Sequence, residues 1–496
     1  MNLKNTLVLF FAILCVVFAF PTHAQNTPTR FLTLEEVIAM AREQSPDAMA
    51  ARHRYRGSYW QHQSYRAGYL PGLRFDATLP NLNRNIQAIT LEDGSDVFVR
   101  RSLASSSGTL SLNQRVPFSG GQFFVSSGLE RIDLLREDGN LTSFLSTPIN
   151  IGFSQPIFAF NPYKWERKIE PLRFQEARKR YIEDLETISL RANALFFDLL
   201  LAQINIEIST LNLANNDTLY QISKGRFSLG RIAENELLQM ELNVLNSEAS
   251  LEQARIDYEG ALFRLRSFLR LDKMDNLALV VPQQRHEMVV QVEMALEKAR
   301  QNRSDIIGFE RRQLEAESEV SRARSESRFN ANMFAVYGLT QTATDFQDVY
   351  RDPLDQQGLR IGIQIPIADW GVGRGRVKMA ESNRELVNSN VEQAMIDFEQ
   401  EIFLRVMAFN MLERQLTIAS KADTIAEKRY EVSRQRYLIG RIDILELNIA
   451  LAEKDRAKQA YLAALRSYWQ GYFEMRRLTL FDFRENRDIT LNFNEI

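Results

Sequence analysis

Apolar residues follow two different periods along this chain, one typical of strands and one typical of long helices. The strand period is clearest over residues 73–79 and 359–367, where an apolar residue takes almost every second position. Alternation of this kind gives a strand one apolar face and one polar face. A sheet on a soluble core would show the same pattern, but the flanking segments are polar helices with no sign of a covering core. The sequence therefore predicts two-faced strands at these positions.

The helical period extends over two segments of unusual length. From Tyr163 to about Lys224, and from Gly373 to about Gln435, the chain contains no proline except Pro171. At about 1.5 Å per residue, roughly 60 residues form a rod about 90 Å long. Apolar residues of the second segment recur every three or four positions, at Val387, Val391, Ala394, Phe398, Ile402, Val406, Phe409, Leu412, Leu416 and Ala419. This spacing predicts a coiled-coil seam, so we expect the helices in a coiled coil or a helical tube.

Each rod is expected to end at a glycine. Gly230 and Gly440 follow the last helical residues, and glycine readily takes the left-handed conformation that stops a helix and turns the chain back. Return helices are then predicted over about 232–271 and 442–478.

Shorter helices precede the strands. Thr33 and Glu36 have the spacing of a capping box, which opens a helix that ends near Ser45. A further helix is expected over about 47–69.

The whole arrangement occurs twice. Residues 226–232, RFSLGRI, match residues 436–442, RYLIGRI, at an offset of 210. At an offset of 258, Ala41-Arg42 matches Ala299-Arg300 and Asp47 matches Asp305. The difference of 48 is extra sequence in the first copy, among its predicted strands. A repeat of this length indicates two structurally equivalent halves around one axis.

This repeat defines the expected organisation of the chain. We predict a signal peptide at 1–24, a first helix-strand-helix repeat at 25–285, a second repeat at 286–480 and a C-terminal tail at 481–496. The extra residues of the first repeat include a predicted hairpin at about 107–132.

The first residues have the features of a secretory signal. Lys4 supplies the positive charge, Leu7–Phe20 is apolar throughout, and small residues precede an expected cleavage after Ala24. The single cysteine, Cys15, lies inside this segment, which excludes disulfides and thiol catalysis from the mature chain. No later uninterrupted apolar stretch reaches the length of a membrane-spanning helix, so a membrane-embedded form would have to use strands.

Composition excludes several classes of function. The formal net charge of the whole chain is −2, which provides no basic surface for nucleic acid. The four histidines lack metal-site spacing, and no nucleophile-base-acid set stands out. Residues 371–375 read G-x-G-x-G, not the G-x-G-x-x-G of a nucleotide-binding loop, and are interpreted as a strand–helix elbow. We therefore expect no cofactor, no metal and no enzymatic activity.

Several duplicated motifs resemble the TolC-type outer-membrane efflux-duct family (outer membrane factors). They are the LTLEE opening at Leu32–Glu36, the helix-to-strand elbow at Leu70-Pro71, and the aromatic-x-x-Gly turns at Phe227–Gly230 and Tyr437–Gly440. The resemblance extends from Leu32 to about Phe481. Their order, occurring twice, is more specific than any one motif.

The resemblance implies a mainly α fold with β structure. In that family three copies form one tube: long coiled-coil helices make a periplasmic helical barrel, and strands of all three copies make one β-barrel in the outer membrane. The tube would be a passive channel, closed at its helical tip, that meets a periplasmic adaptor and through it an inner-membrane pump. The expected role is the exit duct of a tripartite efflux or type I secretion system.

The family also implies where the channel is gated and where its adaptor docks. Charged and aromatic side chains beside the turns would narrow the tube; the matching residues here are Gly230, Arg231, Glu234, Glu236, Tyr437, Gly440, Arg441, Asp443 and Glu446. The two arginines could instead satisfy carbonyl groups at the helix ends.

Aromatic residues cluster at the strand–helix elbows, at Tyr69, Phe158, Phe160, Tyr163, Trp165 and Trp370. They are expected either in a belt at the membrane interface or in packing against neighbouring helices.

The extra residues of the first repeat allow two topologies. Residues 108–116 and 122–129 alternate, with a tight turn at 117–121 between them, and could add two strands to the barrel. The first repeat would then supply four strands and the second two, about 18 in a trimer. Residues 80–106 and 133–146 are expected as long outside loops. In the rival topology the hairpin stands above the membrane as an extracellular extension.

Two other functions remain as alternatives. A periplasmic adaptor would also have a signal and a long helical hairpin, but only one hairpin with flanking small domains. An outer-membrane enzyme is the third class.

Overall fold

The computed structural model describes residues 30–136, 139–271, 277–282 and 288–493. The expected signal peptide at 1–24 lies outside the described residues.

The chain divides into two compact units, and each contains segments of both sequence repeats. The helical unit comprises the described residues of 1–49, 187–287 and 411–473. The sheet unit comprises the described residues of 50–186, 288–410 and 474–496.

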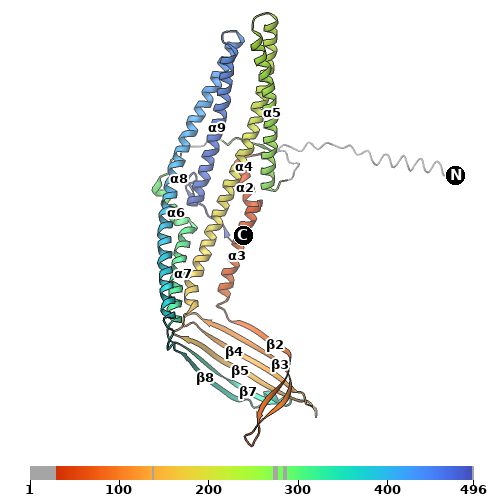
Figure 1. Cartoon of the computed structure of the whole chain (residues 1–496), viewed down its shortest axis with the longest axis vertical. Coiled ribbons are helices and arrows are strands. Elements are labelled where there is room, and N and C mark those ends of the chain that lie inside the picture. Colours follow the sequence, from red (N-terminus) through yellow and green to blue (C-terminus); the bar gives the residue numbers. More distant parts are fainter. Residues whose placement is uncertain (1–29, 137–138, 272–276, 283–287, 494–496) are drawn as a thin grey trace, which may run out of the picture. The chain divides into compact units, whose positions relative to one another are not determined.

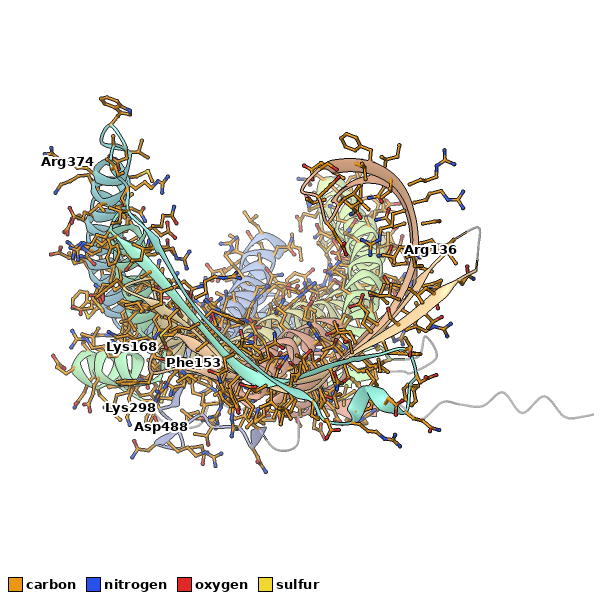
Figure 2. The ribbon with its side chains drawn as sticks, turned by 90° about the horizontal axis from the view of Figure 1, so that it is seen from below. Arg136, Phe153, Lys168, Lys298, Arg374 and Asp488 are labelled. Carbon is orange, nitrogen blue, oxygen red and sulfur yellow. The ribbon has the colours of Figure 1, made fainter. Side chains whose placement is uncertain are left out.

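The sheet unit is built on one antiparallel sheet of six strands in the order β2-β3-β4-β5-β7-β8 (Figure 1). The strands are β2 (Gly72–Thr90), β3 (Asp96–Val116), β4 (Gly121–Leu134), β5 (Leu141–Ile157), β7 (Asn330–Ala343) and β8 (Leu354–Gln364). The sheet curves without closing on itself (Figure 2), so β2 and β8 are its edges. Four of these strands come from the first repeat and two from the second, which is the strand count of the first of the two topologies that the sequence allows.

The prediction of long loops at 80–106 and 133–146 is wrong. β2 continues to Thr90 and β3 begins at Asp96, while only a short connection separates β4 from β5. The register of β2 against β3 shifts between Thr78 and Asn81. Such a bulge moves the following side chains to opposite faces, which interrupts the alternation that marks a strand in the sequence.

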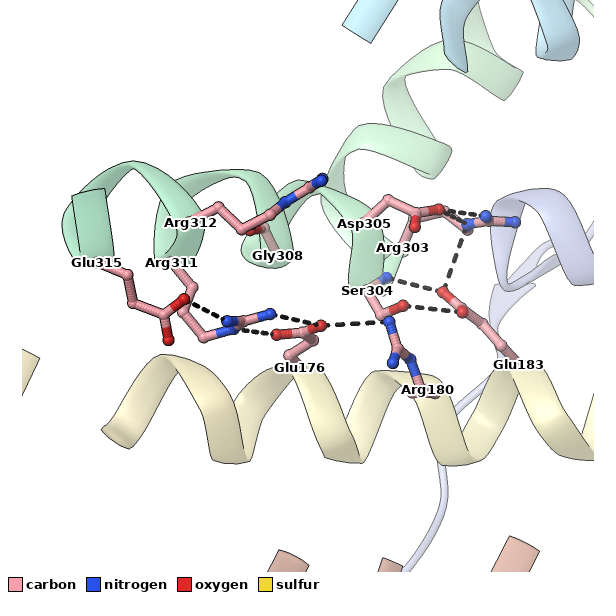
Figure 3. Close-up of polar contacts among 10 residues, drawn as sticks. All are labelled: Glu176, Arg180, Glu183, Arg303, Ser304, Asp305, Gly308, Arg311, Arg312 and Glu315. Carbon is pink, nitrogen blue, oxygen red and sulfur yellow. Dashed lines mark hydrogen bonds and ion pairs between the residues drawn. The ribbon is translucent and has the colours of Figure 1, made fainter. Parts of the chain in front are cut away.

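Helices of the sheet unit include most of α3 (Pro46–Ala67), all of α6 (Val292–Asn302) and α7 (Ser304–Glu326), and the first parts of α4 (Pro162–Ser228) and α8 (Val372–Leu438). Acidic residues of α4 bind basic and polar groups at the start of α7 (Figure 3). Nε of Arg311 donates to Oε2 of Glu176 over 2.6 Å, and the backbone N–H of Ser304 donates to Oε1 of Glu183 over 2.7 Å. α7 is therefore fixed to α4 by charged hydrogen bonds.

The helical unit contains α2 (Leu34–Gln44), α5 (Glu234–Leu269), most of α9 (Ile444–Thr479) and the remaining parts of α4 and α8. The predicted capping box at Thr33 and Glu36 is present. The short strand β1 (Arg30–Leu32) pairs in parallel with β6 (Leu277–Leu279).

The predicted seam of α8 is confirmed. Val391, Phe398, Ile402, Val406, Phe409 and Leu416 are buried, and the other four predicted positions are partly buried. Charged residues occupy many of the exposed positions between them, as the amphipathic pattern requires, but apolar residues such as Phe403, Leu404 and Met407 are also exposed there.

The two repeats give helices of equal length. α4 and α8 have 67 residues each, and α5 and α9 have 36 each. α2 and α6 have 11 each. The sequence offsets of 210 and 258 therefore also relate the ends of the helices.

Among the described residues, one helix, α4, includes a stretch with the length and composition of a membrane-crossing helix. Core helices pass the same test. Two charged residues of α4 form ion pairs within the helical unit, Arg191 with Asp47 and Asp198 with Arg466.

Candidate functional site

The two glycine turns lie in the helical unit and have the same geometry. Gly230 and Gly440 have φ of 66° and 73°, the left-handed conformation expected of them. The N–H of Arg231 donates to the Arg226 carbonyl over 2.9 Å, and the N–H of Gly230 donates to the Phe227 carbonyl over 2.8 Å. These two bonds form a Schellman motif, which satisfies carbonyl groups at the end of α4.

The second turn repeats this pattern. Arg441 donates its N–H to the Arg436 carbonyl over 2.9 Å, and Gly440 donates to Tyr437 over 2.9 Å. The arginines after the glycines thus satisfy helix carbonyls with their backbone, while their side chains are exposed. Both side chains remain available to a partner or to the bore of a tube.

Tyr437 differs from the other predicted turn residues because it is buried. Its ring is 5% exposed, whereas Phe227, at the same position of the first repeat, is 41% exposed. The Arg226 guanidinium lies over the Tyr437 ring, 5.2 Å from its centre, and the Ser223 hydroxyl is 3.5 Å from the Tyr437 hydroxyl. Tyr437 therefore joins the end of α8 to the end of α4.

A compact apolar cluster surrounds this tyrosine. Its buried members are Leu219, Met240, Tyr430, Tyr437, Ile444, Leu447 and Ala450. They come from α4, α5, α8 and α9, so the two turns share one core.

The acidic residues beside the turns have different roles. Asp443 caps α9, because its Oδ1 accepts the N–H of Glu446 over 2.9 Å. Ala233 holds the corresponding position before α5 and makes no side-chain cap. Glu234 and Glu446 are exposed and Glu236 is half-buried. Their carboxylates lie in the first turns of helices, where negative charge is favourable.

A partly buried polar pair that no sequence motif marks lies farther from the turns. Nδ2 of Asn212 in α4 donates to Oδ2 of Asp455 in α9 over 2.6 Å. Burial raises the pKa of the Asp455 carboxyl, although the bond from Asn212 opposes this effect. Neither residue interrupts the helical pattern, so the sequence offered no signal for the pair.

The predicted elbow aromatics lie in the sheet unit and form two groups. Tyr69 and Tyr163 pack edge to face with ring centres 6.2 Å apart, and the Tyr69 hydroxyl donates to Glu166 over 3.2 Å. Burial is the main cause that raises the pKa of Tyr69. These tyrosines are packed against their elbow.

The second group is more exposed. Phe158 is 70% and Trp370 is 97% exposed. Phe158 contacts Phe329 with ring centres 5.6 Å apart, while Phe160 lies under Arg322 and Trp165 under Lys168. For this group, a belt at a membrane interface stays a prediction.

The elbow after β8 is a tight turn that uses the conformational freedom of glycine. Gly371 has φ of 93°, and Asp369 accepts the N–H groups of Gly371 and Gly373 over 3.0 and 2.8 Å. These bonds lower the pKa of the Asp369 carboxyl. A carboxylate occupies the backbone donors of this elbow, so the sequence-based exclusion of a phosphate loop agrees with the geometry.

Residues 295–479 of this chain match the sequence model of the outer membrane efflux protein family. The sequence matches no curated protein. Solved structures of bacterial outer-membrane channels share the fold over most of the chain.

One is the CmeC outer membrane channel of Campylobacter jejuni, with a TM-score of 0.65 and 16% identity, covering 93% of this chain and 88% of its own. Another is the VceC outer membrane protein of Vibrio cholerae, with a TM-score of 0.63 and 14% identity, covering 92% and 97%. The open MtrE outer membrane channel of Neisseria gonorrhoeae has a TM-score of 0.62 and 14% identity, covering 92% and 91%. At such identities the likeness concerns the fold.

The fold resembles these channels along most of both chains, whereas an adaptor would carry a single hairpin. The family match over residues 295–479 therefore lies within a chain whose whole fold is similar to that of solved outer-membrane channels.

Proposed function

We propose that three copies of this chain form a passive exit duct in the outer membrane, as part of a tripartite efflux or type I secretion system. The observation that carries the proposal is the open six-stranded sheet of one copy, joined in sequence to paired helices of 67 residues. An open sheet edge cannot face lipid, because its backbone groups would have no hydrogen-bond partners. Shared strands remove these edges, and three copies give about 18 strands.

The face chemistry of the sheet supports insertion into a membrane. Leu73, Phe75, Leu359 and Ile361 alternate with polar residues and are more than half exposed in the single chain. Such a face is suited to lipid, with the polar face directed at a water-filled bore. The exposed Trp370 and Phe158 fit an interface belt.

We place the gate and the adaptor contact at the two glycine turns. Arg231, Glu234, Arg441 and Glu446 leave charged side chains exposed there. In a trimer, each exposed charge is repeated three times around one axis, so like charges and their partners are concentrated at the tip. A periplasmic adaptor with complementary charges would bind at this tip and couple the duct to an inner-membrane pump. The channel itself performs no catalysis, and the pump selects the cargo.

Single-channel recording tests both the duct and its gate. Purified trimers in planar bilayers should conduct weakly at rest, and the double substitution Arg441→Ala with Glu446→Ala should raise the conductance. A double variant of unchanged conductance would place the gate elsewhere, and a preparation of monomers without conductance would overturn the duct.

A further inference from the structure

The two edge strands of the sheet are unusually exposed and apolar on one face. Every residue of β2 and of β8 is exposed. The last residue of β8 that pairs with β7 is Gln364. The alternation nevertheless continues beyond it, with Ile365 60% and Ile367 95% exposed. This stretch lacks a strand partner within the described chain.

The internal repeat indicates what pairs with β8. Within one copy, β5 is the last strand of the first repeat and β7 is the first strand of the second, and the two are antiparallel neighbours. The offset of 210 carries the end of β5 to β8, and the offset of 258 relates β7 to β2. The next junction of the same kind joins β8 of one copy to β2 of another.

We propose that the register of the β5–β7 pair is repeated between copies, so that Ile363 lies directly opposite Ala77 of the next copy. The pair follows from Phe153 and Ala335, which are opposite each other in one chain. This inference rests on the proposed function, because it requires copies to share a sheet.

The rest of the interface follows from the same register. The in-chain pairs Ile151–Tyr337 and Ile157–Ala331 correspond between copies to Ile361 opposite Leu79 and Ile367 opposite Leu73. Ile365 then lies opposite Phe75 of the next copy. The unpartnered 365–367 stretch therefore becomes strand when two copies meet.

The chemistry of the two faces provides an independent check. In this register the isoleucines of one copy align with Leu73, Phe75, Ala77 and Leu79 of the next, all on the apolar face. Gln364 lies opposite Asp76 on the polar face, where its amide can donate to the carboxylate. A slip of one residue would place isoleucines beside Arg74 and Asp76, and every side chain would change face. A slip of two keeps the faces but breaks the repeat.

The same correspondence extends to helices of the sheet unit. The contact between Glu176 of α4 and Arg311 of α7 corresponds between copies to Leu386 of α8 and His53 of α3. Leu386 is 57% exposed in the single chain. A charged contact inside one copy is thus replaced by an aliphatic side chain against an imidazole at the interface between copies.

Paired cysteines test the register directly. Opposed residues of antiparallel strands have Cα atoms about 4.5–5.5 Å apart, within the range of a disulfide. Ala77→Cys with Ile363→Cys, in a chain whose single Cys15 is changed to serine, should give a covalent trimer on oxidation. Each single substitution should give none.

Two further pairs complete the experiment. Phe153→Cys with Ala335→Cys should join strands within one copy, which verifies that oxidation is complete and leaves the monomer mass unchanged. Ala77→Cys with Ile361→Cys reports a register displaced by two residues and should cross-link far less.

A covalent trimer from the displaced pair, or none from either pair, would overturn the register if native mass spectrometry still shows trimers. Monomers by native mass spectrometry would instead overturn the proposed function.

Discussion

The Arg226 guanidinium lies over the ring of Tyr437, with its central carbon 5.2 Å from the ring centre. This contact joins the end of α4 to the end of α8 at the level of the two glycine turns. If the gate opens by separating these helix ends, the contact stabilises the closed state. A cation–π contact contributes about 0.5–1 kcal/mol where it is accessible to solvent.

Arg226→Ala should therefore open the channel more often. A loss of about 0.5–1 kcal/mol corresponds to roughly a two- to fivefold change in the open-to-closed ratio for each copy, measured as open probability in planar bilayers. Arg436→Ala is the matched control, since Arg436 holds the same repeat position and its side chain is exposed. Equal effects of the two substitutions would show that charge at the tip matters more than the ring contact.

Tyr437→Phe distinguishes the contribution of the Tyr437 ring from that of its hydroxyl. The variant keeps the surface beneath Arg226 and loses only the long 3.5 Å contact with Ser223. We expect an open probability close to that of the unmodified chain, measured in the same bilayers. A large increase would assign the closing role to the hydroxyl.

Glu186 holds Arg476 in the interior of the sheet unit. Its side chain is 0% exposed, and its carboxylate accepts hydrogen bonds from Nε and Nη2 of Arg476 over 3.1 and 3.2 Å. Glu186→Ala should lower the free energy of unfolding by about 3–5 kcal/mol, because it leaves a buried guanidinium with fewer partners. Guanidinium denaturation measures the loss. The exposed Glu252–Arg255 pair is the control, where Glu252→Ala should cost at most about 1 kcal/mol.

Burial raises the pKa of the Glu183 carboxyl, more than Arg303 and Ser304 lower it. A pKa raised by folding contributes stability below the unfolded pKa, near 4.5, and that contribution is lost as pH rises through the folded pKa. Glu183→Gln keeps an acceptor for Ser304 but does not titrate. Its stability relative to the unmodified chain should therefore improve as pH rises from about 4 to 7, measured by denaturation midpoints. A difference that is constant with pH would contradict this reasoning.

Gly152 leaves room for an aromatic stack on the polar face of the sheet. A Cβ at this position would lie 2.2 Å from Cζ of Phe124, whose ring stacks on Phe334 with centres 5.7 Å apart. Gly152→Ala should destabilise the sheet by about 1–3 kcal/mol, measured by heat denaturation followed by circular dichroism. Gly362→Ala, at the same position of the second repeat, meets its nearest heavy atom at 3.9 Å and should be nearly neutral.

Most of the helical architecture could be predicted from the sequence because its signals are long and occur twice. The seam of α8 and the glycine turns depend on residues a few positions apart, and the repeat tested each interpretation against a second copy. The strand boundaries were harder, because the bulge after Thr78 interrupts the alternation.

The environments of the side chains at the candidate site could not be predicted from the sequence. Phe227 and Tyr437 hold the same place in the same motif, yet one is exposed and the other is buried under Arg226. The repeat predicts the turn around each ring, but a ring's environment depends on four helices that meet only in three dimensions. Asn212 and Asp455 lie 243 residues apart, and no local pattern relates them.

The equal lengths of α4 and α8 restrict how a chain of this type can grow or shrink. One inserted residue turns the rest of a helix by about 100° and advances it by about 1.5 Å, which removes the seam from its partner. An insertion of seven residues preserves the seam, but in one repeat alone it would displace one glycine turn by about 10 Å relative to the other. Natural variants should therefore change length in heptad-sized blocks, made in both repeats at once.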